Sequence, residues 1–130
     1  MNQLRRTSVI SASALTIAII WASLDPSGGD VVAGHHRSAH LVSYAMLAFA
    51  WRIALARLAG WLVALFVIAF GFLQEGIEIF GHSHSFEVKD ALINALGAIV
   101  GVGFAHVGVK WLGTITNPSG GESQNVSSDD

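Results

Sequence analysis

Four long apolar stretches constrain this sequence more than any other feature, at about residues 7–24, 39–56, 61–80 and 91–112. Around Leu62 to Phe72 and Ala91 to Val102 almost no polar side chains occur, so these helices would lack the polar face of a soluble helix. A helix rises about 1.5 Å per residue, so each stretch is just long enough to cross a hydrocarbon core of about 30 Å. With 52% hydrophobic and only 12% charged residues, the chain has too little charge to cover a soluble domain. The sequence therefore predicts an all-α fold, a polytopic membrane bundle of four transmembrane helices.

The segments between the apolar stretches predict where the chain leaves the membrane. Residues 25–30 and 81–85 are rich in turn-forming Gly and Ser, and the short break at residues 57–60 is typical of a helical hairpin. The transmembrane domain would occupy residues 1–112. The polar tail of residues 113–130 has almost nothing to bury, so we expect it to be disordered.

The basic residues predict an orientation. Under an alternating four-span arrangement they divide unequally, with Arg5, Arg6, Arg52, Arg57 and Lys110 on one side and Arg37 and Lys89 on the other. The side richer in Lys and Arg is normally cytoplasmic, which places both termini in the cytoplasm. Arg5 and Arg6 before an apolar run are also typical of a secretory signal peptide. Trp21 and Leu24 crowd the possible cleavage region, which favours a first membrane helix instead.

Charge and cysteine content exclude two classes of function. A formal net charge of -2 and a pI near 6.3 do not provide the strongly basic surface that nucleic-acid binding requires. The chain has no cysteine, so it forms neither disulfides nor thiolate metal sites. Any metal would have to bind histidine and carboxylate.

Ionisable and polar residues gather at one end of the apolar stretches. His36, His40 and Tyr44 begin the second, Glu75 and Glu78 end the third, and Asp90 and Asn94 begin the fourth. If the stretches alternate in direction, all these groups meet on the outer side. A charge at membrane depth costs roughly 2.5 to 3.5 kcal/mol on insertion scales, so such groups are kept for pairing, binding or chemistry.

Structural interpretations of the same residues remain open. His36, His40 and Tyr44 lie on one helical face and could anchor the helix at headgroup level. The two glutamates could belong to an ion-pair cluster that only fixes helix packing. Asp90 stands where a helix N-cap is expected.

Small residues predict helix contacts, because close backbone approach promotes association in lipid. Gly97 and Gly101 form a GxxxG motif on the fourth stretch. Three helical stripes are predicted to face neighbours, namely Asn94, Gly97, Gly101, Ala105 and Gly108; Ala64, Gly71, Glu75 and Glu78; and Ala14, Ala18 and Ala22.

Three blocks of this sequence together resemble the VanZ-like family of small bacterial membrane proteins. The blocks are Arg37, His40 and Tyr44; residues 71–78, Gly-Phe-Leu-Gln-Glu-Gly-Ile-Glu; and residues 85–101, which include Asp90, Asn94, Gly97 and Gly101. The family pattern is approximately DK..H...Y, then G...E..Q, then R.....D...N..G...G. The resemblance implies a multi-pass protein of the cell inner (plasma) membrane. One member gave the family its name through low-level resistance to the glycopeptide teicoplanin, but the resemblance supplies no reaction.

The sequence departs from this pattern at four positions. His36 stands where the family usually has Asp, Glu78 where it has Gln, His84 where it has Arg, and Arg37 where it has Lys. The additional histidines suggest a zinc shell of His36, His40, His82 and His84 with Glu75, Glu78 or Asp90. Because His36 and His84 replace residues that are usually not histidine, we predict no metal and no cofactor.

We expect an outward-facing site that recognises a lipid-linked envelope precursor or a phospholipid headgroup. The candidate catalytic residues are His40, Glu75 and Asp90, and the candidate ligand contacts are His36, Arg37, Tyr44, Glu78, His84 and Asn94. Arg37, His40 and Lys89 would contact phosphate, and Glu75 or Asp90 would accept a proton. Whether the protein is an enzyme stays open.

Two other classes of function remain. The first is a non-enzymatic scaffold whose polar cluster is structural and whose GxxxG face or tail engages a membrane-protein partner or a second copy of the chain. The second is a pH sensor or ion path built on the histidines. Membrane lipids are the expected partners in every case, and nucleic acid in none.

Overall fold

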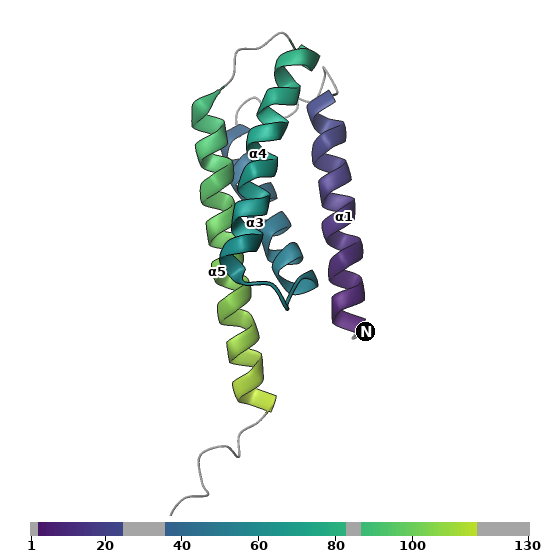
Figure 1. The fold of residues 1–130 in the computed structure, drawn as a ribbon, viewed down its shortest axis with the longest axis vertical. Coiled ribbons are helices and arrows are strands. Elements are labelled where there is room, and N and C mark those ends of the chain that lie inside the picture. Colours follow the sequence, from purple (N-terminus) through teal and green to yellow (C-terminus); the bar gives the residue numbers. More distant parts are fainter. Residues whose placement is uncertain (1–2, 25–35, 83–86, 117–130) are drawn as a thin grey trace, which may run out of the picture.

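The computed structural model describes residues 3–24, 36–82 and 87–116, and these residues form four α-helices without a strand. The helices are α1 (Gln3–Leu24), α3 (His36–Ala54), α4 (Gly60–His82) and α5 (Val88–Thr116). They alternate in direction, so the start of α1, the end of α3 and the start of α4 lie at one end of the bundle (Figure 1). The prediction of an all-helical fold is confirmed.

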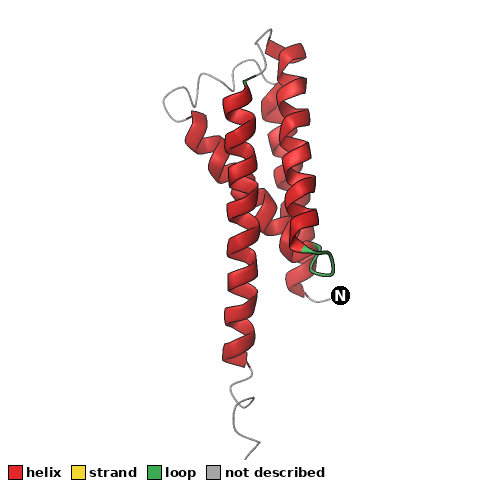
Figure 2. Ribbon diagram, turned by 60° about the vertical axis from the view of Figure 1, so that its left-hand side comes forward, coloured by secondary structure: helices red, strands yellow, loops and turns green. Residues whose placement is uncertain are grey.

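The predicted boundaries are close to the observed ones. Each helix begins one to four residues earlier than predicted, and α5 continues to Thr116, four residues beyond the predicted end. The tight hairpin lies at residues 55–59, where the amide of Leu58 donates to the carbonyl of Leu55 at 2.9 Å. Figure 2 shows this turn close to the N-terminus. Residues 117–130, most of the predicted tail, lie outside the described residues.

Two of the four helices could cross a membrane by length and composition. The segments Gly60–Ile77 of α4 and Val88–Trp111 of α5 meet this criterion, and α1 and α3 do not. Only 28% of each segment is buried inside the protein, whereas the core helix of a soluble protein is mostly buried. The long apolar faces of α4 and α5 are therefore directed outward.

The contact between α3 and α5 is the most extensive in the bundle, and glycine makes it possible. A Cβ atom on Gly97 would lie 2.6 Å from the carbonyl oxygen of Leu41, and one on Gly101 would overlap the carbonyl group of Ala45. The predicted close contact at the GxxxG motif is confirmed. Because α3 covers this motif, it cannot also serve as the partner surface that the scaffold hypothesis considered.

The predicted inner stripe of α1 is wrong. Ala14, Ala18 and Ala22 are exposed, and Ala12 is fully buried. Two long-range side-chain bonds set the rotation of α1. The Arg5 Nε donates to the carbonyl of Ala54 at 3.0 Å, and the Trp51 indole donates to the hydroxyl of Thr16 at 3.3 Å.

Candidate functional site

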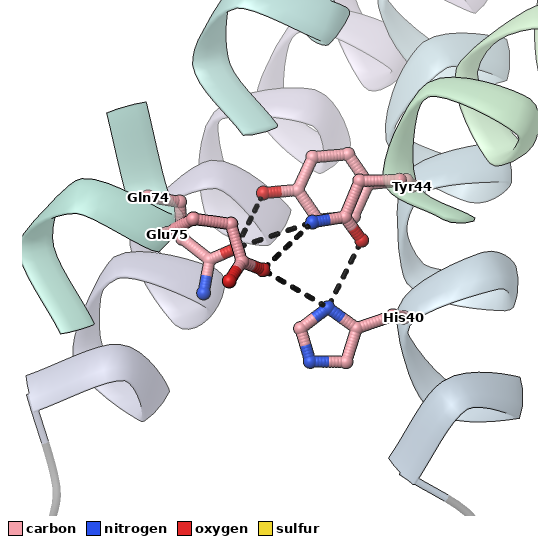
Figure 3. Close-up of polar contacts among 5 residues, drawn as sticks. His40, Tyr44, Gln74 and Glu75 are labelled. Carbon is pink, nitrogen blue, oxygen red and sulfur yellow. Dashed lines mark hydrogen bonds and ion pairs between the residues drawn. The ribbon is translucent and has the colours of Figure 1, made fainter. Parts of the chain in front are cut away.

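A polar network joins three helices in the half of the bundle that contains the start of α3 and α5. His40 and Tyr44 come from α3, Gln74 and Glu75 from α4, and Asn94 from α5. The two α3 side chains point toward the two α4 side chains, and dashed lines mark the interactions (Figure 3). The prediction that His40, Tyr44, Glu75 and Asn94 lie together is confirmed.

The network has one consistent set of donors and acceptors. The Asn94 amide nitrogen lies 3.3 Å from Glu75 Oε1 and 3.5 Å from Gln74 Oε1, so it donates to both. Asn94 Oδ1 must then accept, and it lies 2.9 Å from His40 Nδ1. Since an amide oxygen only accepts, the His40 proton is on Nδ1. The Tyr44 hydroxyl donates to Gln74 Oε1 at 2.9 Å.

Four of the five network residues are buried, and the fifth, His40, is partly exposed. Asn94 is fully buried, Tyr44 is 1% exposed, and Gln74 and Glu75 are each 3% exposed. The His40 side chain is 12% exposed and its Nδ1 lies 4.0 Å from Glu75 Oε1, an ion pair only when the ring is protonated. His40 is therefore the most exposed residue of the network.

Gly71 provides the space in which the network forms. A Cβ atom at this position would lie 3.1 Å from both Asn94 Cβ and Tyr44 Cε1. Contacts this short would require the Tyr44 ring or the Asn94 side chain to shift by a few tenths of an ångström. The glycine thus lets the Tyr44 ring and the Asn94 side chain pack against the backbone of α4.

Asp90 lies near the network but does not cap α5. The amides of Asp90 and Ala91 both donate to the carbonyl of Glu87, so Glu87 holds the N-cap position. The predicted capping role is wrong because α5 begins at Val88, which puts Asp90 in the first turn. There its carboxylate is 3% exposed and stabilised by the positive end of the helix dipole.

The remaining predicted site residues divide into exposed ones and undescribed ones. Arg37 and Lys89 are exposed in the first turns of α3 and α5, at the same end as the network. His36 and Glu78 belong to helices, but their side chains lie outside the described part, as does the whole of His84. Among the described residues no three His, Asp or Glu side chains are grouped to hold a metal ion. The suggested zinc shell depends largely on histidines outside those residues.

Gln74 is the network residue that the sequence analysis missed. It accepts from both Tyr44 and Asn94, so it links α4 to each of the other two helices. The signal was present, because Gly71, Gln74, Glu75 and Glu78 follow the helical spacing i, i+3, i+4, i+7. The predicted stripe of Ala64, Gly71, Glu75 and Glu78 omits this amide, although it lies on the same face.

Comparisons of the chain with protein-family models, with curated proteins and with solved structures found no match.

Proposed function

We propose that this chain is a VanZ-like protein of the bacterial inner membrane that crosses it four times, with both termini in the cytoplasm. Large apolar side chains are exposed on every helix, including those that miss the hydropathy criterion, with Ile10 of α1 at 69% and Met46 of α3 at 54%. Soluble proteins rarely expose such continuous apolar surface. At about 1.5 Å per residue, α1 and α3 are about 33 and 28 Å long, which suits a hydrocarbon core of about 30 Å.

The positions of the motif residues support the family proposal. Tyr44, Glu75 and Asn94, which come from three separate blocks of the pattern, meet in one network. Gly97 and Gly101 of the third block meet the backbone of α3. The three sequence blocks are therefore parts of one structural unit, as expected if they form a single family motif.

The function we propose is recognition of a phosphate-bearing headgroup, that of a lipid-linked envelope precursor or a phospholipid, at the outer end of the bundle. The observation that carries this proposal is that His40 is the one partly exposed member of an otherwise buried network. Arg37 lies three residues before His40, so both side chains are on one face of α3. The exposed Lys89 adds a second cation at this end. The guanidinium and the ammonium bind phosphate, and the network holds the imidazole beside them.

Glu75 acts in this proposal as a positioning residue. Its carboxylate is buried and accepts from Asn94, which in turn fixes the orientation of His40. No reaction is assigned to the site.

Equilibrium binding of undecaprenyl phosphate to the purified full chain in phosphatidylcholine nanodiscs tests the site. We expect the double variant Arg37→Gln/Lys89→Gln to lose roughly tenfold in affinity, because charge-assisted bonds to phosphate are lost. The matched control Arg6→Gln/Arg57→Gln removes two exposed cations from the opposite end and should bind like wild type. Equal affinity of the two double variants would refute headgroup recognition here.

The burial of the network favours a second candidate, a scaffold in which these polar groups only hold three helices together. Tyr44, Gln74, Glu75 and Asn94 have almost no surface with which to meet a ligand. In that case the binding assay gives no dependence on Arg37 and Lys89. Loss of a network residue then changes thermal stability alone.

A further inference from the structure

A groove lies at the other end of the bundle, between α1 and α5, with α3 as its floor. Its volume is about 510 Å³, within the range of about 300 to 1,000 Å³ that is usual for small-molecule sites. The lining is mainly apolar, and Met46, Phe49 and Phe104 on it are 54%, 41% and 68% exposed. The groove is thus open along its side.

The length of the groove distinguishes between the occupants that fit an apolar surface. Its lining covers Thr7 to Leu15 on α1 and Ala45 to Ile53 on α3, so it is about 12 Å long at about 1.5 Å per residue. Half of a hydrocarbon core is about 15 Å thick. A partner helix packed lengthwise would extend well beyond this groove, since a spanning helix is about 30 Å long. A single acyl chain from one leaflet matches the observed length.

Charge at the end of the groove specifies the headgroup. Arg5, Arg6, Arg52 and Arg57 belong to this end, whereas every Asp and Glu of the described residues lies near the opposite end, namely Glu75, Glu78, Glu87 and Asp90. Counted over the described residues, the end of the bundle at which the groove begins therefore carries a net positive charge. A lipid that fills the groove is selected for a negative headgroup.

Arg5 is already held where such a headgroup would lie. Its Nε donates to the carbonyl of Ala54, the residue after the last groove residue of α3, Ile53. A guanidinium has five N–H donors, so the two terminal amino groups can still bind a phosphate in the bidentate manner typical of arginine. Ser8 and Ser11 line the same part of the groove, and a serine hydroxyl can donate to the ester oxygens of a lipid.

We infer that this groove binds one acyl chain of an anionic phospholipid from the adjacent leaflet, with the lipid phosphate on Arg5. The inference rests on the proposed membrane placement but not on the proposed headgroup site, which lies at the other end. The lipid fills the space between α1 and α5 and joins the arginine end of both α1 and α3.

Native mass spectrometry of the purified full chain with phosphatidylglycerol and with phosphatidylcholine of identical acyl chains tests the headgroup contact. We expect Arg5→Gln to weaken phosphatidylglycerol binding roughly tenfold and to leave phosphatidylcholine binding unchanged. Arg6→Gln, the matched control, should keep the wild-type preference because Arg6 is exposed, whereas Arg5 is held on the Ala54 carbonyl beside the groove. The same preference in both variants would overturn the assignment of Arg5.

A bulky residue placed in the groove tests the groove itself. This test does not depend on Arg5, whose substitution could also loosen the contact of α1 with α3. Ser11 lines the groove at an exposed position of α1, and Ala14 is exposed outside it. We expect Ser11→Phe to lose binding of both lipids and Ala14→Phe to retain it.

Two results would refute the groove as a lipid site. One is equal lipid binding by Ser11→Phe and Ala14→Phe. The other is efficient disulfide formation between two chains that carry Ser11→Cys but not between chains that carry Ala14→Cys, since a second copy would then fill the groove. The chain has no cysteine of its own to interfere. Neither result affects binding of undecaprenyl phosphate, whose dependence on Arg37 and Lys89 tests the headgroup site separately.

Discussion

The two ends of this bundle differ in how their polar side chains are paired. At the end where α3 and α5 begin, acid, amide, phenol and imidazole groups satisfy one another, and Asn94 makes contacts with His40, Gln74 and Glu75. At the end where α1 begins, arginines gather without a described acid, and Arg5 donates to Ala54, the residue after Ile53 of the groove lining. At the first end, which we call the closed end, the polar groups find their partners within the chain. In our proposal, a lipid from outside the chain completes the other, open end.

The difference follows from the cost of charge in an apolar medium. A buried acid is tolerated when polar neighbours surround it; the Asn94 amide donates to Glu75, and the His40 ring lies 4.0 Å from it. An arginine at the membrane boundary needs no internal partner, because its long stem carries the charge to headgroup depth. We therefore expect substitutions inside the buried network to change stability and substitution of Arg5 to change lipid affinity.

The largest expected effect comes from the contact between α3 and α5, which lies between the two ends. Gly101→Leu puts a side chain into the backbone of Ala45, which must move α5 away from α3. Overpacking costs about 1 to 3 kcal/mol and occasionally more, and here the obstacle is rigid backbone, so we expect a free-energy loss of about 3 kcal/mol or failure to fold. Thermal unfolding in detergent, followed by size-exclusion chromatography, measures it.

The control for that substitution is Gly103→Leu, two residues further along α5. Nothing lies within 4 Å of a Cβ atom at Gly103, so a side chain there projects outward. This variant should unfold at or above the wild-type temperature. Equal unfolding temperatures of the two leucine variants would show that the α3–α5 contact is not as close as described.

The second effect tests the closed end directly. Asn94→Ala leaves His40 without its 2.9 Å partner and removes the donor shared by Gln74 and Glu75. A buried group without its hydrogen bond costs about 1 to 3 kcal/mol, so we expect a loss in that range by thermal unfolding. Leu96→Ala, at a 53% exposed position of the same helix, should lose far less. Similar losses would mean that the network contributes little beyond its volume.

Much of the closed end could be predicted because helical spacing alone determines it. His40 and Tyr44 are four residues apart, and an antiparallel arrangement brings the start of α3 beside the end of α4 and the start of α5. The same reasoning predicted the contact at Gly97 and Gly101. Both predictions need only the period of a helix and the direction of each span.

The open end could not be predicted in this way. The rotation of α1 depends on bonds from Arg5 to Ala54 and from Trp51 to Thr16, which connect residues 49 and 35 positions apart. Small residues on α1 occur on more than one face, so Ala12 and Ala14 were equally good candidates for the inner side. The groove forms only once that rotation is fixed, and no local pattern in the sequence indicates it.

The smallest expected effect comes from the loss of one hydrogen bond, that from Tyr44 to Gln74. Tyr44→Phe removes the hydroxyl that donates to Gln74 but keeps the ring, which lies 6.2 Å from the Phe70 ring centroid to centroid. Side-chain hydrogen bonds between membrane helices average about 0.6 kcal/mol, so we expect a loss of about that size, well below the loss for Asn94→Ala. Ser43→Ala removes a half-buried hydroxyl from the same helix outside the network and should leave the unfolding temperature unchanged.

The same tyrosine variant also tests whether the two ends are independent. Tyr44 lies far along α3 from Ala54, where Arg5 is bound, so phosphatidylglycerol binding should be unaffected by the loss of its hydroxyl. If Tyr44→Phe instead weakened lipid binding as Arg5→Gln does, the closed end would control the open one through α3. Conversely, Tyr44→Phe could lower stability as much as Asn94→Ala does. That result would mean that the Tyr44 hydroxyl holds the Gln74 side chain in place, and that without it Gln74 Oε1 no longer accepts from the Asn94 amide.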